Sequence, residues 1–216
     1  MYDPKRELEE NEIMKLNDPY KFVVANIAKL EEWSGKKYDL RLYDSDRDEK
    51  DYNEFNSEIL YQTNLYFIVI DSENNVFGHY HPGEINDCIN LDDNTFLFTL
   101  YSNERCGVKK FDVKGKLTFM PKDIRYYKGN CAYNAKHTWT KINYDDGEED
   151  DSDLDDFFLK YTGGSLNVYY SIGVIDTNTS YINNDLIVND FEGIERNTLR
   201  RNGLFKTKRI IVIQMK

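Results

Sequence analysis

Cysteine is scarce in this sequence, with three residues in a chain of 216. Cys88, Cys106 and Cys131 are odd in number, and none has the close C-x-x-C spacing of a zinc or redox site. This pattern favours reduced, mostly buried thiols over a disulfide framework.

Long apolar runs are absent as well. No stretch of 18 or more apolar residues occurs, and the first ten residues, MYDPKRELEE, are charged where a signal peptide carries an apolar segment. We therefore expect a soluble intracellular protein, cytoplasmic or with a nuclear location as the alternative, that does not insert into a membrane.

Histidine is the third scarce residue type, with His79, His81 and His137 as its three members. In a strand, residues two apart project from the same face, so His79 and His81 could share a metal if a third ligand arrived from elsewhere. Nothing in the sequence supplies that ligand, and we expect surface or interface histidines. Neither a G-x-S-x-G elbow nor a phosphate-binding glycine motif occurs. We therefore predict no catalytic residue, no metal and no cofactor.

Charge is present but unevenly spread. The net charge is -11, and the segment 145–156, DDGEEDDSDLDD, holds nine acidic residues and no basic one. Like charges at this density repel one another and stay hydrated, so we expect a loop between two structured segments.

A second acidic stretch resembles part of a calcium loop. Asp44, Asp46 and Asp48 stand at loop positions one, three and five, but Glu49 replaces the glycine of position six and Phe55 the glutamate of position twelve. A solvated turn is the better interpretation.

The first 37 residues favour helices. Each of two Asp-Pro pairs places a capping residue before a proline, which predicts helices over 4–16 and 19–33. The second predicted helix has an apolar stripe that includes Val23, Ile27 and Leu30, and Gly35 ends it. We expect this stripe to pack on its own domain; pairing of the helices in a homodimer is the alternative.

From residue 64 onward the pattern is that of strands, in keeping with an aromatic content of 14%. The segment 64–70 has too few polar positions for a half-exposed strand, and 76–81 returns after a turn at Asn74 and Asn75. Further strands are expected at 95–101, 108–113, 116–120, 165–175 and 208–215. The prediction is a mainly β chain with flanking helices: a two-layer antiparallel β-sandwich over 38–216, preceded by the helical segment 1–37.

The last 21 residues are basic and contain no acid. Their cations are Arg196, Arg200, Arg201, Lys206, Lys208, Arg209 and Lys216. An exposed basic loop over 196–209 is the first interpretation, and a phosphate-contacting surface is the second.

Several segments, taken in order, resemble the TLDc family, which includes the oxidation resistance proteins. The resemblance spans residues 38–216 and rests on these segments: Phe77-Gly78, the F-L-F strand at Phe96, Leu97 and Phe98, KFDVK at 110–114, the glycine turn at Gly163 and Gly164, and the final strand within 205–215. The chain departs from the family pattern at Ser165 and Ile211, where the family has a third glycine and an acid.

The resemblance implies a β-sandwich with helices at its sides and no established catalytic residue. It also implies protection against oxidative stress and, as in several relatives, binding to the peripheral sector of the vacuolar proton-pumping ATPase (V-ATPase).

Our leading hypothesis is therefore a non-enzymatic protein-interaction module. Its candidate partner surface comprises the segment from His79 through His81 to Glu84, the acidic loop 145–156 and the basic segment 196–209. The alternative is a DNA-binding regulator that places Arg196, Arg200, Arg201, Lys206 and Lys208 on phosphates.

Overall fold

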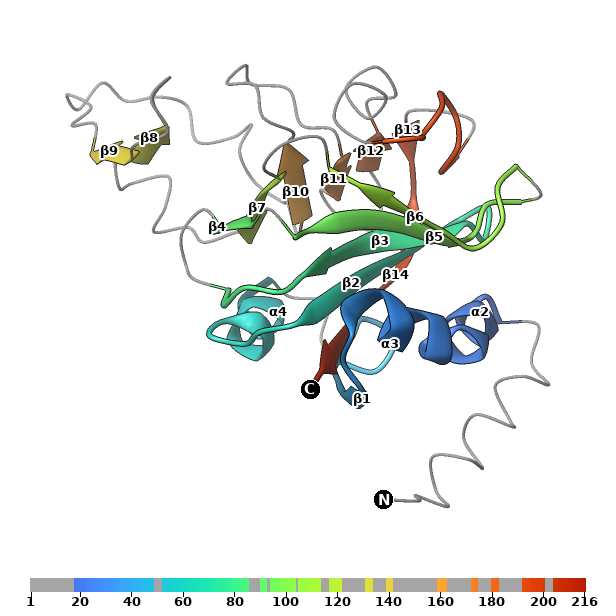
Figure 1. Cartoon of the computed structure of the whole chain (residues 1–216), viewed down its shortest axis with the longest axis horizontal. Coiled ribbons are helices and arrows are strands. Elements are labelled where there is room, and N and C mark those ends of the chain that lie inside the picture. The colour runs from blue at the N-terminus through green and yellow to red at the C-terminus, as the bar shows by residue number, and fades with distance from the viewer. Residues whose placement is uncertain are drawn as a thin grey trace.

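The computed structural model describes residues 18–48, 52–85, 90–92, 94–103, 105–113, 117–121, 131–133, 139–141, 159–162, 172–174, 180–182, 192–200 and 204–216 (Figure 1). The predicted helix 4–16, the acidic loop 145–156, Cys88, Arg201 and the glycine pair Gly163 and Gly164 lie outside these residues.

The largest element is a six-stranded sheet in which all neighbouring strands are antiparallel. Its strands, in spatial order, are β1 (Tyr38–Asp44), β14 (Thr207–Met215), β2 (Leu65–Asp71), β3 (Val76–His81), β5 (Phe96–Tyr101) and β6 (Lys109–Asp112). The last described strand, β14, thus lies between the first two, β1 and β2, and pairs with both of them.

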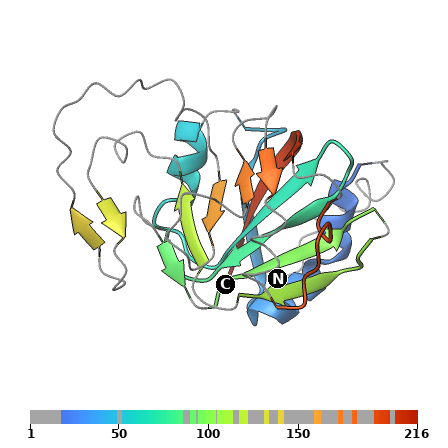
Figure 2. The ribbon, with the colours of Figure 1, turned by 90° about the horizontal axis from the view of Figure 1, so that it is seen from above.

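A second sheet of shorter strands lies over one face of the first (Figure 1). Its order is β13 (Leu204–Phe205), β12 (Ser180–Ile182), β11 (Ile172–Val174), β10 (Leu159–Thr162), β7 (Leu117–Pro121) and β4 (Asn90–Asp92). The short hairpin of β8 (Cys131–Tyr133) and β9 (Trp139–Lys141) stands apart from both sheets (Figure 2). The predicted class, a mainly β sandwich-like fold with flanking helices, is confirmed.

The helices α2 (Tyr20–Ala25) and α3 (Ile27–Ser34) cover the opposite face of the first sheet (Figure 1). They replace the single helix predicted over 19–33, because the backbone leaves the helical region at Asn26, where φ is -115° and ψ is 13°. The Asn26 side-chain amide donates to the carbonyl of Phe22 at 2.7 Å, a local bond that competes with helix propagation. Gly35 ends α3 in the left-handed region, as predicted, with φ of 67°.

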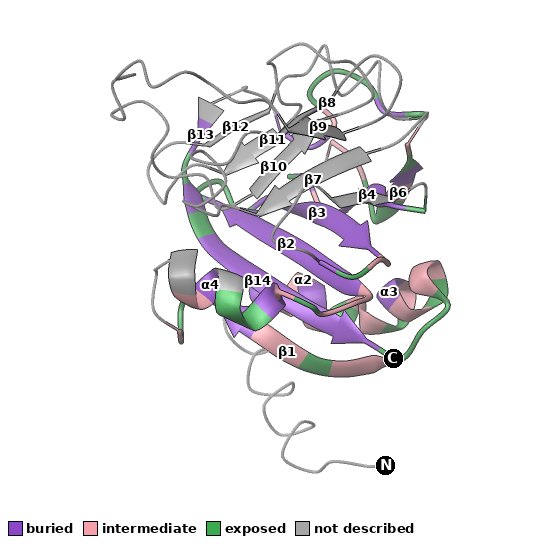
Figure 3. Cartoon of the chain, turned by 90° about the vertical axis from the view of Figure 1, so that its left-hand side faces the viewer, coloured by how far each residue is buried: buried purple, intermediate pink, exposed green. Residues whose placement is uncertain are grey.

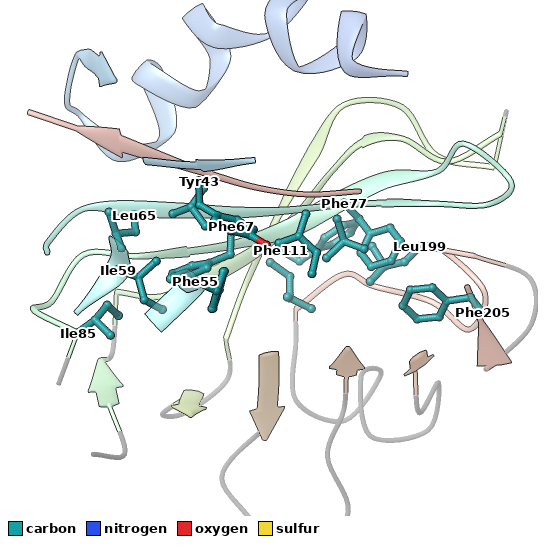
Figure 4. Close-up of a cluster of buried hydrophobic side chains, with 14 of the residues drawn as sticks. Tyr43, Phe55, Ile59, Leu65, Phe67, Phe77, Ile85, Phe111, Leu199 and Phe205 are labelled. Carbon is teal, nitrogen blue, oxygen red and sulfur yellow. The ribbon is translucent and has the colours of Figure 1, made fainter. Parts of the chain in front are cut away.

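Both faces of the first sheet are buried at its centre, where every residue of β2 and β3 is enclosed (Figure 3). Alternation along β2 assigns Phe67 and Val69 to an apolar cluster on the side of the second sheet, and Tyr66 and Ile68 to a cluster under the helices. We call the first the inter-sheet core and the second the helix-side core. Figure 4 shows the inter-sheet core below the first sheet.

The helix-side core confirms that the α2–α3 stripe packs on its own domain. Val23 and Leu30 are fully buried there, and the Tyr66 hydroxyl donates to the carbonyl of Leu30 at 2.8 Å. Trp33 adds an edge-to-face contact with Phe96, with ring centroids 6.3 Å apart. The helical segment therefore shares one core with the sheet.

The solvated turn predicted around residues 43–55 is confirmed only in part: residues 45–47 form a turn in which Asp46 and Arg47 are exposed. Asp44 is fully buried, and residues Tyr52–Ile59 form the helix α4. Phe55 and Ile59, four residues apart on α4, both enter the inter-sheet core, where the Phe55 ring contacts Tyr43 edge-on at 5.0 Å. The acidic residues of this stretch suggest a turn, but its second half forms a short amphipathic helix.

Gly78 is the position where the sheet has no room for a side chain. A Cβ built there would collide with the backbone carbonyl oxygen of Phe67 and would lie 3.0 Å from the ring carbon Cζ of Phe98. Gly78 pairs with Phe98 across the β3–β5 ladder, so the Phe98 ring occupies the space that the glycine leaves. The prediction that a glycine permits close packing here is confirmed.

Candidate functional site

The structure buries both histidines that the sequence placed on a partner surface. His79 and His81 are 0% and 1% exposed, so the expectation of surface histidines is wrong. The His79 ring stacks on Phe67 with centroids 4.6 Å apart, and the His81 Nδ1 atom lies 3.3 Å from the Thr95 hydroxyl. The physical reason is the position of β3 between β2 and β5, inside a sheet covered on both faces.

Burial sets the protonation state of His79. It lowers the pKa of the His79 imidazole well below its ordinary value, and the charge of His81 lowers that pKa further. His79 is therefore a neutral core residue at pH 7.

Arg200 is also buried, so its predicted role as an exposed phosphate ligand is wrong. It is 2% exposed; its Nε donates to Asp71 at 3.0 Å and its Nη2 to Glu73 at 2.9 Å. The guanidinium carbon lies 5.1 Å from the centroid of the Phe205 ring. The two carboxylates neutralise the charge of Arg200, which the sequence predicted to contact a phosphate.

Asp71 organises the turn between β2 and β3. Its Oδ1 accepts hydrogen bonds from the backbone N–H groups of Glu73 and Asn75, at 2.8 and 2.9 Å, and its Oδ2 accepts from the Asn75 amide at 2.7 Å. Asn74, in the predicted turn, has a positive φ of 64°. Arg105 then donates to the Asn75 side chain at 2.7 Å and to the carbonyl of Leu199 at 3.1 Å.

These contacts gather four segments at one end of the first sheet, which we call the loop end. It consists of 71–75, the described residues of 102–108 (102–103 and 105–108), 192–200 and 204–208. Of the predicted basic residues, Arg196, Lys206 and Lys208 are exposed there. The exposed acids Glu73 and Glu195 lie in the same segments, so the loop end carries both signs of charge.

Glu84 lies at the opposite end of the β2–β3 hairpin. It is exposed in the segment 82–85, which is bonded to the segment 61–64: the Tyr61 N–H donates to the Ile85 carbonyl at 2.7 Å and the Asn64 N–H to the Pro82 carbonyl at 3.1 Å. We call these two segments the Tyr61 end. The structure therefore separates two parts of the predicted partner surface.

A further ion cluster, around Arg209, was not predicted. Its Nε and Nη2 donate to the two carboxylate oxygens of Asp44 at 2.7 and 2.6 Å, and its Nη1 donates to Asp18 at 3.3 Å. Burial alone would lower the pKa of Arg209, but the hydrogen bond and charge of Asp44, with smaller contributions from Asp46 and Asp18, raise it above its ordinary value. The Asp44-Asp46 pair, noted in the sequence as a fragment of a calcium loop, thus binds an internal cation.

Four motif residues of the family resemblance belong to the two cores. Phe77 and Leu97 are buried in the inter-sheet core, and Phe96 and Phe98 in the helix-side core. Cys106 is a half-buried free thiol, as expected, and its backbone N–H donates to the Ser102 hydroxyl at 2.7 Å.

Within the described part of the chain, His, Cys, Asp and Glu side chains form no group of three that could hold a metal ion. No helix among the same residues is both long and apolar enough to cross a membrane.

Comparison with known proteins finds no protein-family model that matches the chain and no match among curated proteins.

Proposed function

We propose that this chain is a non-enzymatic interaction module of the TLDc type that acts in the oxidative-stress response by binding the peripheral sector of the V-ATPase. The observation that carries the proposal is the contact between Gly78 and Phe98. In the sequence these residues belong to two separate motifs of the resemblance, F-G and F-L-F, and in the fold they face each other across one ladder. A steric dependence of this kind explains why the two motifs occur together.

The assignment as a non-enzymatic module is supported by where the motif residues lie. Phe77, Phe96, Leu97 and Phe98 are buried in the two apolar cores. His79 and His81, the pair that the sequence offered for a metal, are enclosed in the same sheet. A scaffold of this kind presents its exposed ends to a partner, as rigid sheets commonly present binding loops.

The test is direct binding of the purified full chain to the purified peripheral sector of the V-ATPase, measured by co-sedimentation. We expect a stoichiometric complex. Two variants locate the contact: one in which Arg196, Lys206 and Lys208 are each changed to Glu, and a matched control, Lys36→Glu, on an exposed residue after α3. The absence of a complex at low ionic strength, with a chain that is folded by circular dichroism, would overturn the proposed partner.

The same preparation tests the nucleic-acid alternative. Arg200 is buried and ion-paired with Asp71 and Glu73. Of the cations predicted to contact phosphates, Arg196, Lys206 and Lys208 are the ones that are exposed among the described residues. Titration with duplex DNA would reveal a phosphate-binding function by an affinity that falls steeply with salt. Tight, salt-dependent DNA binding without a V-ATPase complex would replace our proposal by that alternative.

A further inference from the structure

Tyr61 is the most exposed large hydrophobic side chain in the described part of the chain. It is 66% exposed, whereas Leu40 and Val108 are each 40% exposed. Tyrosine is enriched among residues that dominate protein interfaces, because it combines a large apolar surface with a polar end. The exposure of Tyr61, two residues after the end of α4, therefore needs an explanation other than core packing.

The backbone of Tyr61 is held in a conformation that tyrosine disfavours. Its φ is 62°. Among the described residues, the other positive-φ residues that are not glycine are all asparagine: Asn64, Asn74, Asn103 and Asn197. Asparagine tolerates this region better than other residues do, and glycine or asparagine is usual after a helix. Tyrosine thus stands in a conformation that the described part of this chain otherwise gives to asparagine or glycine.

Hydrogen bonds fix this backbone on both sides. The Tyr61 N–H donates to the carbonyl of Ile85 at 2.7 Å, the Ile85 N–H donates to the carbonyl of Gln62 at 2.9 Å, and the Gln62 N–H donates to that of Ile59 at 3.2 Å. Ile59 and Ile85 are themselves buried in the inter-sheet core (Figure 4). The Tyr61 ring is therefore presented from a pre-organised backbone, which lowers the entropic cost of binding.

Among the described residues, the surroundings of Tyr61 carry negative charge. Residues 51–104 contain no lysine or arginine. Glu58, three residues before Tyr61, and Glu84, directly before Ile85, are both exposed. Lys37 and Lys216, whose backbones are bonded to each other beside the end of β14, are ion-paired with Glu31 at 2.8 Å and Asp39 at 2.6 Å.

We propose that Tyr61, Glu58 and Glu84 form a docking surface for a basic segment of a protein partner. A lysine or arginine side chain would lie over the face of the Tyr61 ring, as cations do on aromatic rings, and neighbouring cations would meet the two carboxylates in charge-assisted hydrogen bonds. Phosphate-bearing partners are disfavoured here because the charges have the same sign. The inference rests on the proposed function only in requiring a protein partner.

The test measures binding of the full chain to three labelled peptides of equal length by fluorescence anisotropy. One carries lysine and arginine, the second has glutamate at those positions, and the third has serine. We expect binding of the basic peptide alone, weakened by salt. In Tyr61→Asn we expect about threefold to fivefold weaker binding, the contribution of one exposed cation–π contact. The double variant Glu58→Gln/Glu84→Gln should also bind less.

Tyr61→Asn separates binding from folding. Because asparagine suits the backbone at this position, the melting temperature should be unchanged or higher while binding is weakened about threefold to fivefold. Val108→Ala, which trims an exposed side chain at the loop end, is the matched control and should leave binding unchanged. Equal binding of the basic and acidic peptides, or full binding by Tyr61→Asn, would overturn the docking surface.

Capture of the V-ATPase sector by the same variants distinguishes the two proposals. If the wild-type chain and Tyr61→Asn capture the sector equally and the basic peptide does not bind, the docking surface is wrong and the proposed function stands. If the basic peptide binds through Tyr61 but the sector is not captured, the docking surface stands and the proposed partner is wrong.

Discussion

At Gly78, a single methyl group has no space in the folded chain. We predict that Gly78→Ala lowers the free energy of unfolding by about 1–3 kcal/mol or more, because the obstructing atom is a backbone carbonyl oxygen that cannot move to another rotamer. Urea denaturation measures the change. Gly107→Ala is the control, since nothing lies within 4 Å of a Cβ built there, and its effect should be small or slightly stabilising. Equal losses at both positions would contradict the steric explanation.

His79 makes the stability of the folded chain decrease as the pH is lowered. Its pKa is lowered in the folded state relative to about 6.5 in an unfolded chain, so the unfolded state binds more protons as the pH falls. The stability linked to His79 is therefore complete above pH ~6.5 and is lost progressively below it. We predict that His79→Phe, which keeps a ring against Phe67, flattens the decline of the urea midpoint between about pH 7 and 5. An unchanged slope would show that His79 does not titrate on unfolding.

At the scale of elements, Asp71 and Arg200 join the β2–β3 turn to the segment before β13. We predict that Asp71→Asn costs about 3–5 kcal/mol of unfolding free energy, because it leaves the buried Arg200 guanidinium short of its main counter-charge. Glu73→Gln should cost less than about 1 kcal/mol, since Glu73 is 41% exposed. Both are measured by chemical denaturation.

A double variant, Asp71→Asn/Arg200→Met, separates the pair from the turn. It should be more stable than Asp71→Asn alone if an uncompensated buried charge is the source of the loss. Were the double variant less stable than either single one, the turn hydrogen bonds of Asp71 would be the larger contribution.

Helices and strands could be predicted from the sequence where the local pattern of apolar and turn residues determines them. The hairpin of 64–81 follows from an uninterrupted apolar run, an Asn-containing turn and a second run, and the structure places its strands at Leu65–Asp71 and Val76–His81. The α4 helix was missed because its two core residues, Phe55 and Ile59, follow an acidic stretch that suggests a turn. The interruption at Asn26 depends on a single side-chain hydrogen bond within an otherwise helical pattern.

Whether each basic residue is exposed or buried could not be predicted from the local sequence pattern. Arg200 meets Asp71 across 129 positions of sequence, and Arg209 meets Asp44 across 165. A charge count over 196–216 therefore suggests a basic surface, while the fold uses two of those cations internally. Tyr61 was missed for the same kind of reason, since its positive φ and its bonds to Ile85 exist only in the folded chain.

On the scale of the whole molecule, charges that are segregated in the sequence are brought together by the sheet order. Residues 51–104 have no lysine or arginine, and 196–216 have no acid. β14 lies between β1 and β2, and Arg209 within it and Arg200 before it reach carboxylates at the ends of both neighbours, Asp44 of β1 and Asp71 of β2. What remains exposed differs between the two ends of the hairpin: mixed charge at the loop end and Glu58 and Glu84 at the Tyr61 end.

The same sheet order predicts a gradient of local stability. β14, β2 and β3 are interior strands, and β2 and β3 are buried throughout, whereas β1 is an edge strand with two register irregularities and an exposed Leu40. We predict that backbone amides of β2 and β3 exchange hydrogen only on global unfolding, while those of β1 exchange through local opening at lower free energy. Hydrogen exchange followed by mass spectrometry, at increasing urea, measures both. If peptides from β1 were as protected as those from β2 in the isolated chain, the edge would be covered, and a partner or a second copy pairing along β1 would become the explanation to test by exchange at several protein concentrations.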